Sequence, residues 1–246
     1  MSTEAPRDVR EGGEVVETFA ALGILAFTTG RAVGSFGTQT DEPVREVMAR
    51  WSALRALVGG NGGRLATAVQ VHGAEVIEHG GRWRGWLRGP DADGHLSMER
   101  GTALAVTVAD CVPVFLAHPS GACAALHSGW RGTAARITER AIARFVALGL
   151  PASELLVHCG PAICGACYEV SPDVYEQLTG QLVDAPTAVD LRALIAGHAR
   201  ERGVGSISVS PLCTRCDNDR FYSHRAGDAG RQLGVVFANP LIDSRS

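Results

Sequence analysis

The stretch TALAVTVADCVPVFLA, residues 102–117, holds two nearly continuous apolar runs on either side of Ala109-Asp110-Cys111. β-Branched residues recur in both runs, and strands this apolar are typically buried on both faces of a sheet. The next apolar run, residues 122–126, leads into HSGWRG at 127–132, after which apolar side chains recur at helical spacing. The sequence therefore predicts buried strands, a glycine turn and a helix, which is typical of an α/β protein.

Further helices and strands are predicted outward from this central stretch. Pro43 begins a segment with apolar residues at helical spacing, and Ser171-Pro172 is a favourable pair for the start of another helix. Residues 80–94 contain no sustained apolar run and are expected to form a loop. Helices are expected over 43–58, 133–148, 171–182 and 190–202, and strands over 18–28, 64–71, 75–78, 155–159, 205–210 and 233–238.

The domain organisation follows from the even composition of the 246 residues. No repeat, linker or low-complexity tract divides the chain, so we predict a single α/β (α+β) domain with mixed sheets over residues 18–246. Residues 1–17 are polar and acidic, and we expect them to be a flexible N-terminus.

The cations of this chain are unusually uniform: all 23 are arginine and none is lysine. Schiff-base enzymes, Ser-Lys dyads and Walker loops each need a lysine amine, so these classes are excluded. Codon usage in a GC-rich genome explains such a bias without any functional cause. Even so, any permanently charged side chain that binds an anion here must be arginine.

Charge and hydropathy also limit the partners of the chain. The net charge is −3 and the arginines are scattered, whereas nucleic-acid-binding domains usually carry a strongly basic face. The N-terminal residues have no apolar signal region, and the most apolar stretch is too short to span a bilayer. We therefore expect a cytoplasmic protein that binds neither nucleic acid nor membranes.

Three potential metal ligands lie at or near the ends of apolar strands: His72, Cys111 and His127. Two imidazoles and one thiolate suit Zn²⁺, and three protein ligands leave a fourth position for water, as in catalytic zinc sites. Copper also accepts this donor set. Alternatively, the histidines form hydrogen bonds in turns and Cys111 is a small buried hydrophobe. Asp110 could orient an imidazole or transfer protons, or could be a solvated strand cap.

A second cysteine pattern consists of Cys164-x-x-Cys167 and Cys213-x-x-Cys216. Two such pairs are typical of a Cys₄ zinc site, but the 45 intervening residues exceed those of a compact zinc ribbon. The pattern leaves three readings open, namely a structural zinc site, a disulfide between the pairs, and ordinary buried thiols.

Several ordered motifs carry a resemblance to a known family. The sequence resembles the laccase-domain (YfiH-like) family, also called polyphenol oxidase or purine nucleoside phosphorylase of the laccase-domain type. The similarity rests on VHGA at 71–74, ADCVPV at 109–114, HSGWRG at 127–132, GPAI at 160–163 with CYEV at 167–170, and a tail with FYSHR at 221–225 and GR at 230–231. The chain departs from the family pattern at Gly34-Ser35-Phe36-Gly37, Ala49-Arg50 and Ala226.

The resemblance implies a layered α/β/β/α fold with a catalytic zinc held by His72, Cys111 and His127. It further implies phosphorolysis of adenosine, inosine and methylthioadenosine to free base and a ribose 1-phosphate, together with deamination of adenosine. Zinc would activate water for the deamination. Because the chain lacks lysine, arginine should hold the phosphate, and Arg50, Arg131 and Arg225 are the candidates.

Three other functions compete with this one. A copper-dependent polyphenol oxidase would use the same ligands, although phenol oxidation ordinarily relies on several coppers. An amidase that edits peptidoglycan precursors would use Cys111 or metal-activated water against an amide. A non-catalytic partner protein is the third alternative, but it would not need a metal site with an open position.

Overall fold

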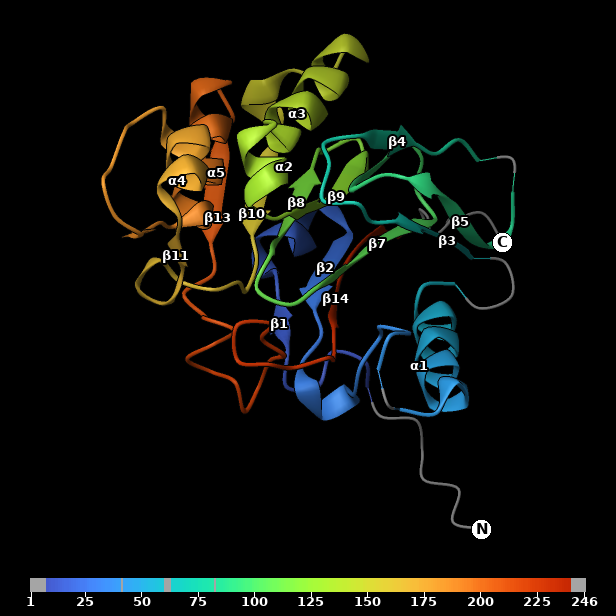
Figure 1. The fold of residues 1–246 in the computed structure, drawn as a ribbon. Helices are drawn as coiled ribbons and strands as arrows, with labels where there is room; N and C mark the ends of the chain where they lie inside the picture. The colour runs from blue at the N-terminus through green and yellow to red at the C-terminus, as the bar shows by residue number, and fades with distance from the viewer. Residues whose placement is uncertain (1–7, 41, 60–62, 82, 240–246) are drawn as a thin grey trace, which may run out of the picture.

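Two mixed sheets form the centre of the molecule (Figure 1). The computed structural model describes residues 8–40, 42–59, 63–81 and 83–239. The first sheet has the order β1 (Glu14–Val15), β2 (Ile24–Thr28), β14 (Gln232–Ala238), β7 (Thr102–Val108), β3 (Arg64–Val69), β5 (Gly85–Asp91). The second has the order β13 (Ser206–Val209), β10 (Leu156–Cys159), β8 (Val112–Ala117), β9 (Cys123–Ser128), β6 (Gly94–Ser97), β4 (Val76–Glu78).

Helices cover the outer face of each sheet. In Figure 1, four helices gather beside the second sheet, whereas α1 (Val44–Leu57) lies apart from them. The four are α2 (Trp130–Ala134), α3 (Ile137–Ala147), α4 (Pro172–Thr179) and α5 (Leu191–Glu201). Short 3₁₀ turns at Glu17–Leu22, Arg31–Val33, Ala152–Glu154 and Gly165–Cys167, and a ribbon of β11 (Glu169–Val170) and β12 (Thr187–Ala188), complete the described elements.

Three hydrophobic clusters correspond to the three interfaces between these layers. One joins the second sheet to its helices, with Phe145 and Ile195 from α3 and α5. The second lies between the sheets, where Phe115 of β8 packs with Val236 of β14. The third joins α1 to the first sheet through Trp51 and Leu54. This layering confirms the expected α/β/β/α arrangement and the mixed sheets.

The structure corrects several predicted elements. Residues 85–91 form β5, not a loop, because they pair in parallel with β3 at a sheet edge where strands need no continuous apolar run. Pro90 is tolerated at such an edge. Residues 17–22 form a 3₁₀ turn, so the strand predicted over 18–28 begins only at Ile24. Arg136 adopts φ 62° and divides the helix predicted after HSGWRG into α2 and α3.

Strand β1 lies inside the N-terminal segment that the sequence suggests is flexible. Glu14 and Val15 pair with Thr28 and Phe27 of β2, and Val9 is buried. Residues 1–7 lie outside the described residues.

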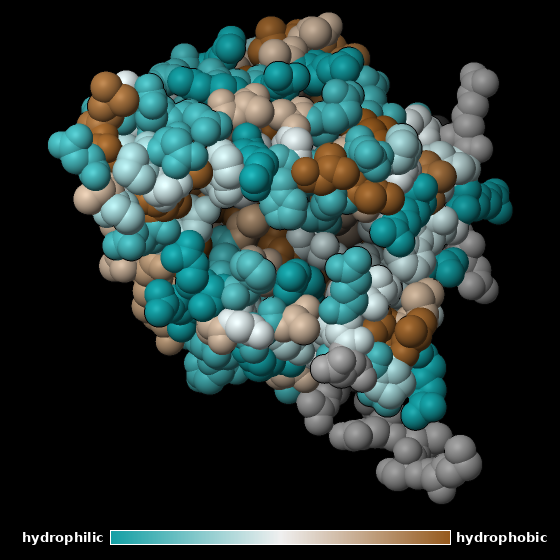
Figure 2. All heavy atoms as spheres, in the orientation of Figure 1, coloured by the Kyte–Doolittle hydropathy of each residue, from teal (hydrophilic) through white to brown (hydrophobic). Residues whose placement is uncertain are grey.

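The surface of the molecule is expected to be mostly polar, because the apolar side chains are buried between the layers. Figure 2 shows a mostly hydrophilic face on which hydrophobic residues form separate groups. Within the described chain, no helix combines the length and the apolar character needed to cross a bilayer.

The close approach of the two sheets at Gly234 generates a prediction. An added Cβ there would lie 2.8 Å from Pro113 Cβ and 3.1 Å from Phe115 Cζ, both on β8 of the facing sheet. Overpacking of this kind costs about 1–3 kcal/mol. Gly234→Ala should therefore lower the Tm and the free energy of unfolding measured in denaturant.

The matched control is Gly197→Ala in α5, where an added Cβ meets nothing within 4 Å. That change should stabilise the protein by about 1 kcal/mol through helix propensity. Equal stability changes for the two variants would contradict this account of the interface between the sheets.

Candidate metal centre

The chain passes between the two sheets at two of the predicted ligands. His72 lies between β3 of the first sheet and β4 of the second, and Cys111 lies between β7 and β8. His72 and Asp110 have positive φ angles of 61° and 78°, a conformation that non-glycine residues seldom adopt and that is enriched at functional sites. His127 lies on β9, just before the turn into α2.

These three side chains converge, as they must if they are to share one metal ion. One ligand atom from each of His72, Cys111 and His127 lies within 4.8 Å of the others. The two imidazole rings meet edge to face, with centroids 4.8 Å apart. His127 is buried, Cys111 is partly buried and His72 is exposed, so the cluster is rooted in the core and open on one side.

Asp93 positions two of the ligands at once. Its carboxylate accepts hydrogen bonds from the backbone N–H groups of Val71, His72 and Gly73, at 3.1, 3.0 and 2.6 Å. It also contacts Nδ1 of His127 at 2.7 Å, which leaves Nε2 of that ring for a ligand role. Burial opposes ionisation of Asp93, but the hydrogen bonds from His127 and the backbone outweigh burial and lower its pKa. Asp93 lies in the segment predicted to be a loop, where a carboxylate is expected to be solvated, so the sequence alone does not identify it.

Asp110, the carboxylate that the sequence suggested for orienting an imidazole, has a different set of partners. Its two oxygens accept hydrogen bonds from Thr214 Oγ1 at 2.6 Å and from the backbone N–H of Arg225 at 2.7 Å. Asp110 therefore anchors residues 214–225, part of a C-terminal segment that continues to Arg231, beside Cys111.

Cys111 and His127 favour a charged pair. Burial alone would raise the pKa of the Cys111 thiol, but the charge of His127 and hydrogen bonds from His127 and His72 lower it to about 6. Burial likewise opposes the charge on His127, whereas the Cys111 thiolate and Asp93 raise the pKa of His127 to about 9. The thiolate is the form of cysteine that binds metals, and a metal would displace the proton of the imidazole.

Gly129 leaves the space that the ligands occupy. An added Cβ would lie 2.8 Å from Cys111 Sγ and 3.4 Å from His72 Cδ2. The residue has φ −80° and ψ −175°, which any amino acid can adopt, so the requirement for glycine is steric and not conformational.

A cavity of about 470 Å³ opens at the three ligands. Its volume falls within the range of small-molecule sites. One wall is aromatic: Trp51 and Trp86 stack with ring centroids 4.5 Å apart, and Phe36 meets Trp51 edge to face. The other lining residues are Gly37, Thr38, Gln39, Thr67, Ala68, Val69, Gln70, Arg88, Ala105, Thr107, Ala109, His224, Ala229 and Arg231.

The three arginines predicted to bind phosphate do not line this cavity. The Arg50 guanidinium forms an ion pair with Glu42 and donates to Ser35 O at 2.6 Å. Arg131 stacks over the Trp130 ring, and Arg225 lies over Tyr168 and donates to Glu169 O. A phosphate-binding role for these arginines stays a prediction. Among the described residues, the arginines in the cavity wall are Arg88 and Arg231, and neither was predicted to bind phosphate.

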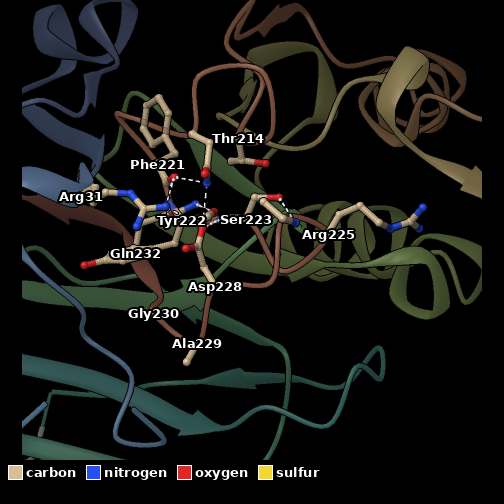
Figure 3. Close-up of polar contacts among 12 residues, drawn as sticks. Arg31, Thr214, Phe221, Tyr222, Ser223, Arg225, Asp228, Ala229, Gly230 and Gln232 are labelled. Atoms are coloured by element: carbon tan, nitrogen blue, oxygen red, sulfur yellow. Dashed lines mark hydrogen bonds and ion pairs between the residues drawn. The ribbon is translucent and has the colours of Figure 1, made fainter. Parts of the chain in front are cut away.

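A C-terminal segment closes one side of the cavity with His224, Ala229 and Arg231. Figure 3 shows Arg31 and Ser223 directed toward Asp228, whereas the Arg225 side chain points away. Asp228 Oδ2 accepts hydrogen bonds from Arg31 at 2.5 Å, Asn218 Nδ2 at 2.7 Å and Ser223 N at 2.9 Å. These bonds fix the segment against the N-terminal part of the fold.

The fold and the site together place the chain in a class of two-sheet α/β proteins that have a His₂Cys cluster at a cavity sized for a small molecule. Residues 32–239 match the family model described as "Multi-copper polyphenol oxidoreductase laccase". The chain belongs to this family, which confirms the resemblance carried by the sequence motifs.

Relatives and solved structures agree with this assignment. The chain is 34% identical to Purine nucleoside phosphorylase ORF3 of Streptomyces griseus, covering 82% of this chain and 85% of that protein. It is 35% identical to Purine nucleoside phosphorylase of Deinococcus radiodurans, covering 86% and 87%. The crystal structure of YlmD from Geobacillus stearothermophilus superposes with a TM-score of 0.82 at 26% identity, covering 92% and 94%. Neisseria meningitidis protein NMB0706 gives a TM-score of 0.80 at 25% identity, covering 94% and 100%.

The shared role of Asp93 generates a prediction for metal affinity. Asp93→Asn removes the charge that pairs with His127 and places an amide against three N–H donors. Loss of a residue that orients metal ligands typically costs about 10–100-fold in affinity. We expect a loss of that size for Zn²⁺, measured by competition with a chromophoric chelator. Asp91→Asn, at an exposed carboxylate two residues away, should bind Zn²⁺ as the wild type does; equal affinity in both variants would count against this role of Asp93.

Gly129→Ala tests the steric requirement. Its backbone can adopt the native angles, so the fold should survive, whereas the added methyl group crowds Cys111 Sγ. Elemental analysis after dialysis against Zn²⁺ should show fewer zinc ions per chain than in the wild type, with an unchanged far-UV circular dichroism spectrum. A variant with full metal content at this cluster would refute the crowding argument.

Proposed function

We propose that this protein is a zinc-dependent purine nucleoside enzyme. It would convert adenosine, inosine and methylthioadenosine, with phosphate, to free base and a ribose 1-phosphate, and would also deaminate adenosine. The observation that carries the proposal is the single cavity in which the His₂Cys cluster faces an aromatic wall and two arginines. The relatives are named purine nucleoside phosphorylases, which supports it.

The donor set fits zinc on several counts. Cys111 favours the thiolate form, His127 has its second nitrogen free because Asp93 engages the first, and Gly129 leaves room beside the sulfur. His72, Cys111 and His127 would hold the ion. A zinc ion there would act as a Lewis acid with a coordination position left for a reactant.

The aromatic wall suits a purine base. The indole N–H groups of Trp51 and Trp86 are already occupied, by Phe36 O at 3.1 Å and Thr67 Oγ1 at 2.8 Å. These bonds fix the rings, and a fixed aromatic face binds a base by stacking, which is worth about 1–3 kcal/mol per base. Thr38, Gln39 and His224 supply polar groups in the same cavity for the edges of the base and the sugar hydroxyls.

Arg88 and Arg231 suit phosphate. Within the described part of the chain, the exposed Arg88 side chain has no ion-pair or hydrogen-bond partner, so its charge is available in the cavity. Among the described residues, the Arg231 guanidinium donates through NH1 to the carbonyl oxygens of Asp228, Ala229 and Gly230, and this orients the group without neutralising it. A guanidinium binds phosphate through two parallel hydrogen bonds.

The two reactions differ in the atom attacked. In phosphorolysis, a phosphate oxygen bonds to C1′ of the ribose while the C1′–N9 bond breaks, and the base leaves with that electron pair and takes up a proton. In deamination, water adds at C6 of adenine and ammonia leaves. The arginines would hold phosphate on the sugar side, whereas the aromatic wall would hold the base in both reactions.

Copper-dependent phenol oxidation is the second candidate, because the matching family model carries that description and a His₂Cys set accepts copper. Phenol oxidation of the multicopper type requires several coppers close together. Among the described residues, the other group of potential ligands consists of four cysteines and supplies no imidazole. This donor chemistry favours the zinc enzyme.

The test uses purified protein with adenosine, with and without phosphate, and separates the products by chromatography. We expect adenine and ribose 1-phosphate only when phosphate is present, and inosine in either case. Cys111→Ala should abolish both reactions. Arg88→Gln should raise the KM for phosphate about tenfold or more, since one charged hydrogen-bonding contact is worth roughly 1.5–3 kcal/mol, while leaving deamination intact.

Arg84→Gln provides the control, because Arg84 is exposed, precedes β5 and does not line the cavity. Its phosphate KM should equal that of the wild type. Stoichiometric copper with phenol turnover, or hydrolysis of an aminoacylated sugar nucleotide, in place of nucleoside turnover, would refute the proposal.

A further inference from the structure

The two cysteine pairs, distant in sequence, meet in space. Cys164 caps the 3₁₀ turn that follows β10 and Cys167 is the last residue of that turn, whereas Cys213 and Cys216 lie in the turn that follows β13. A parallel β-bridge between Ala162 and Cys213 joins the two segments. The four Sγ atoms all lie within 4.8 Å of one another.

This spacing approaches that of a tetrathiolate metal site. Bonds of about 2.3 Å from zinc to four sulfurs place neighbouring sulfurs about 3.8 Å apart. The Sγ atoms of Cys167 and Cys216 are 3.5 Å apart, and all four cysteines are free thiols. Closure around an ion therefore needs shifts of about 1 Å or less in the sulfur positions.

Backbone groups are already directed at one of these sulfurs. The N–H groups of Cys164 and Cys216 donate to Cys213 Sγ at 3.2 and 3.4 Å. Such donors compensate the negative charge that a metal-bound thiolate carries. Arg215, between the second pair of cysteines, donates to Cys167 O at 3.3 Å and brings a positive charge to the other pair.

The remaining buried thiols show how ordinary cysteines behave in this fold. Cys123 and Cys159 are completely buried, and they pack in the cluster between the sheets and the cluster beneath the helices, respectively. The four paired cysteines belong to none of the three hydrophobic clusters of the described chain, and Cys216 is exposed. Their convergence therefore does not come from packing of a hydrophobic core.

We propose that Cys164, Cys167, Cys213 and Cys216 form a second, structural metal site that binds one zinc ion through four thiolates. Four protein ligands complete the tetrahedral shell, so this ion has no position for a reactant and differs in kind from the His₂Cys centre. The proposal stands independently of the reaction catalysed at the cavity.

The site would act as a cross-link for the cavity wall. Thr214, between the second pair of cysteines, donates to Asp110 beside Cys111, and the chain continues to His224 and Arg231 in the cavity. Arg31 and Asp228 fix the far part of this segment. A metal at the four cysteines would fix its beginning to the turn after β10.

The experiment counts metal ions and identifies their ligands in full-length protein purified under reducing conditions. Elemental analysis should give two zinc ions per wild-type chain and one in His72→Ala. The Cys167→Ser/Cys216→Ser double variant should also retain one. After cobalt substitution, His72→Ala should keep the intense sulfur-to-cobalt absorption of a tetrathiolate site, and the double variant should lose most of it. Cys123→Ala, which removes a thiol outside both clusters, should keep both ions.

The wild type and His72→Ala decide the question even if the double variant does not fold. Zinc-free His72→Ala, or a cobalt spectrum without the thiolate bands, would overturn the proposal. Disulfides between the two pairs, found by mass spectrometry in protein alkylated before reduction, would overturn it as well. Hydrogen exchange adds a readout of the cross-link: chelation of the ion should increase exchange in residues 213–231 of His72→Ala but not in α3.

Discussion

The hydrogen bonds of Asp93 are the interaction on which the arrangement of the His₂Cys cluster depends. This carboxylate is completely buried, and a buried charge is tolerated only when hydrogen bonds satisfy it. Three backbone N–H groups and one imidazole do so here. Because the N–H groups belong to the turn that carries His72 and the imidazole belongs to His127, one buried charge aligns two side chains of the cluster from different elements. The same hydrogen bonds hold the turn in which His72 adopts its positive φ.

The layered fold explains how distant residues reach this point. His72 and Cys111 both lie where the chain leaves the first sheet for the second, and His127 lies on a strand of the second sheet. Such passages between sheets are irregular, so their backbone groups need partners outside the strand ladders. Asp93 supplies partners for one passage, and Asp110, through Thr214 and Arg225, ties the other to the C-terminal segment. The His₂Cys cluster thus lies where these passages between the two sheets meet, and polar contacts hold the passages in place.

The sequence predicted those elements that a short stretch of residues specifies by its own hydrophobic pattern or motif. The apolar runs of β7, β8 and β9 and the helical spacing of α1 were predicted, as was the family. The side chains of the three predicted ligands converge, and their binding of a metal stays a prediction. Strands β5 and β6 were missed because one is a half-exposed edge and the other combines polar residues such as His95 with full burial. Asp93 was missed because a carboxylate in a polar segment looks solvated until the fold buries it. The chain has 23 arginines, and the sequence does not show which of them line the cavity, because that depends on tertiary contacts. Arg50, for example, is engaged by an ion pair with Glu42.

The position of β14 has a consequence for folding during synthesis. This strand follows every other described strand in chain order, yet it lies in the first sheet between β2 and β7. Until residues 232–238 leave the ribosome, β14 cannot join β2 to β7. The first sheet is then divided into two parts, β1-β2 and β7-β3-β5, and the edges that β14 would cover are unpaired. Such edges invite pairing with other chains. These edges are covered only once β14 has been synthesised, so a chain truncated before residue 232 would leave them unpaired even though it already carries His72, Cys111 and His127.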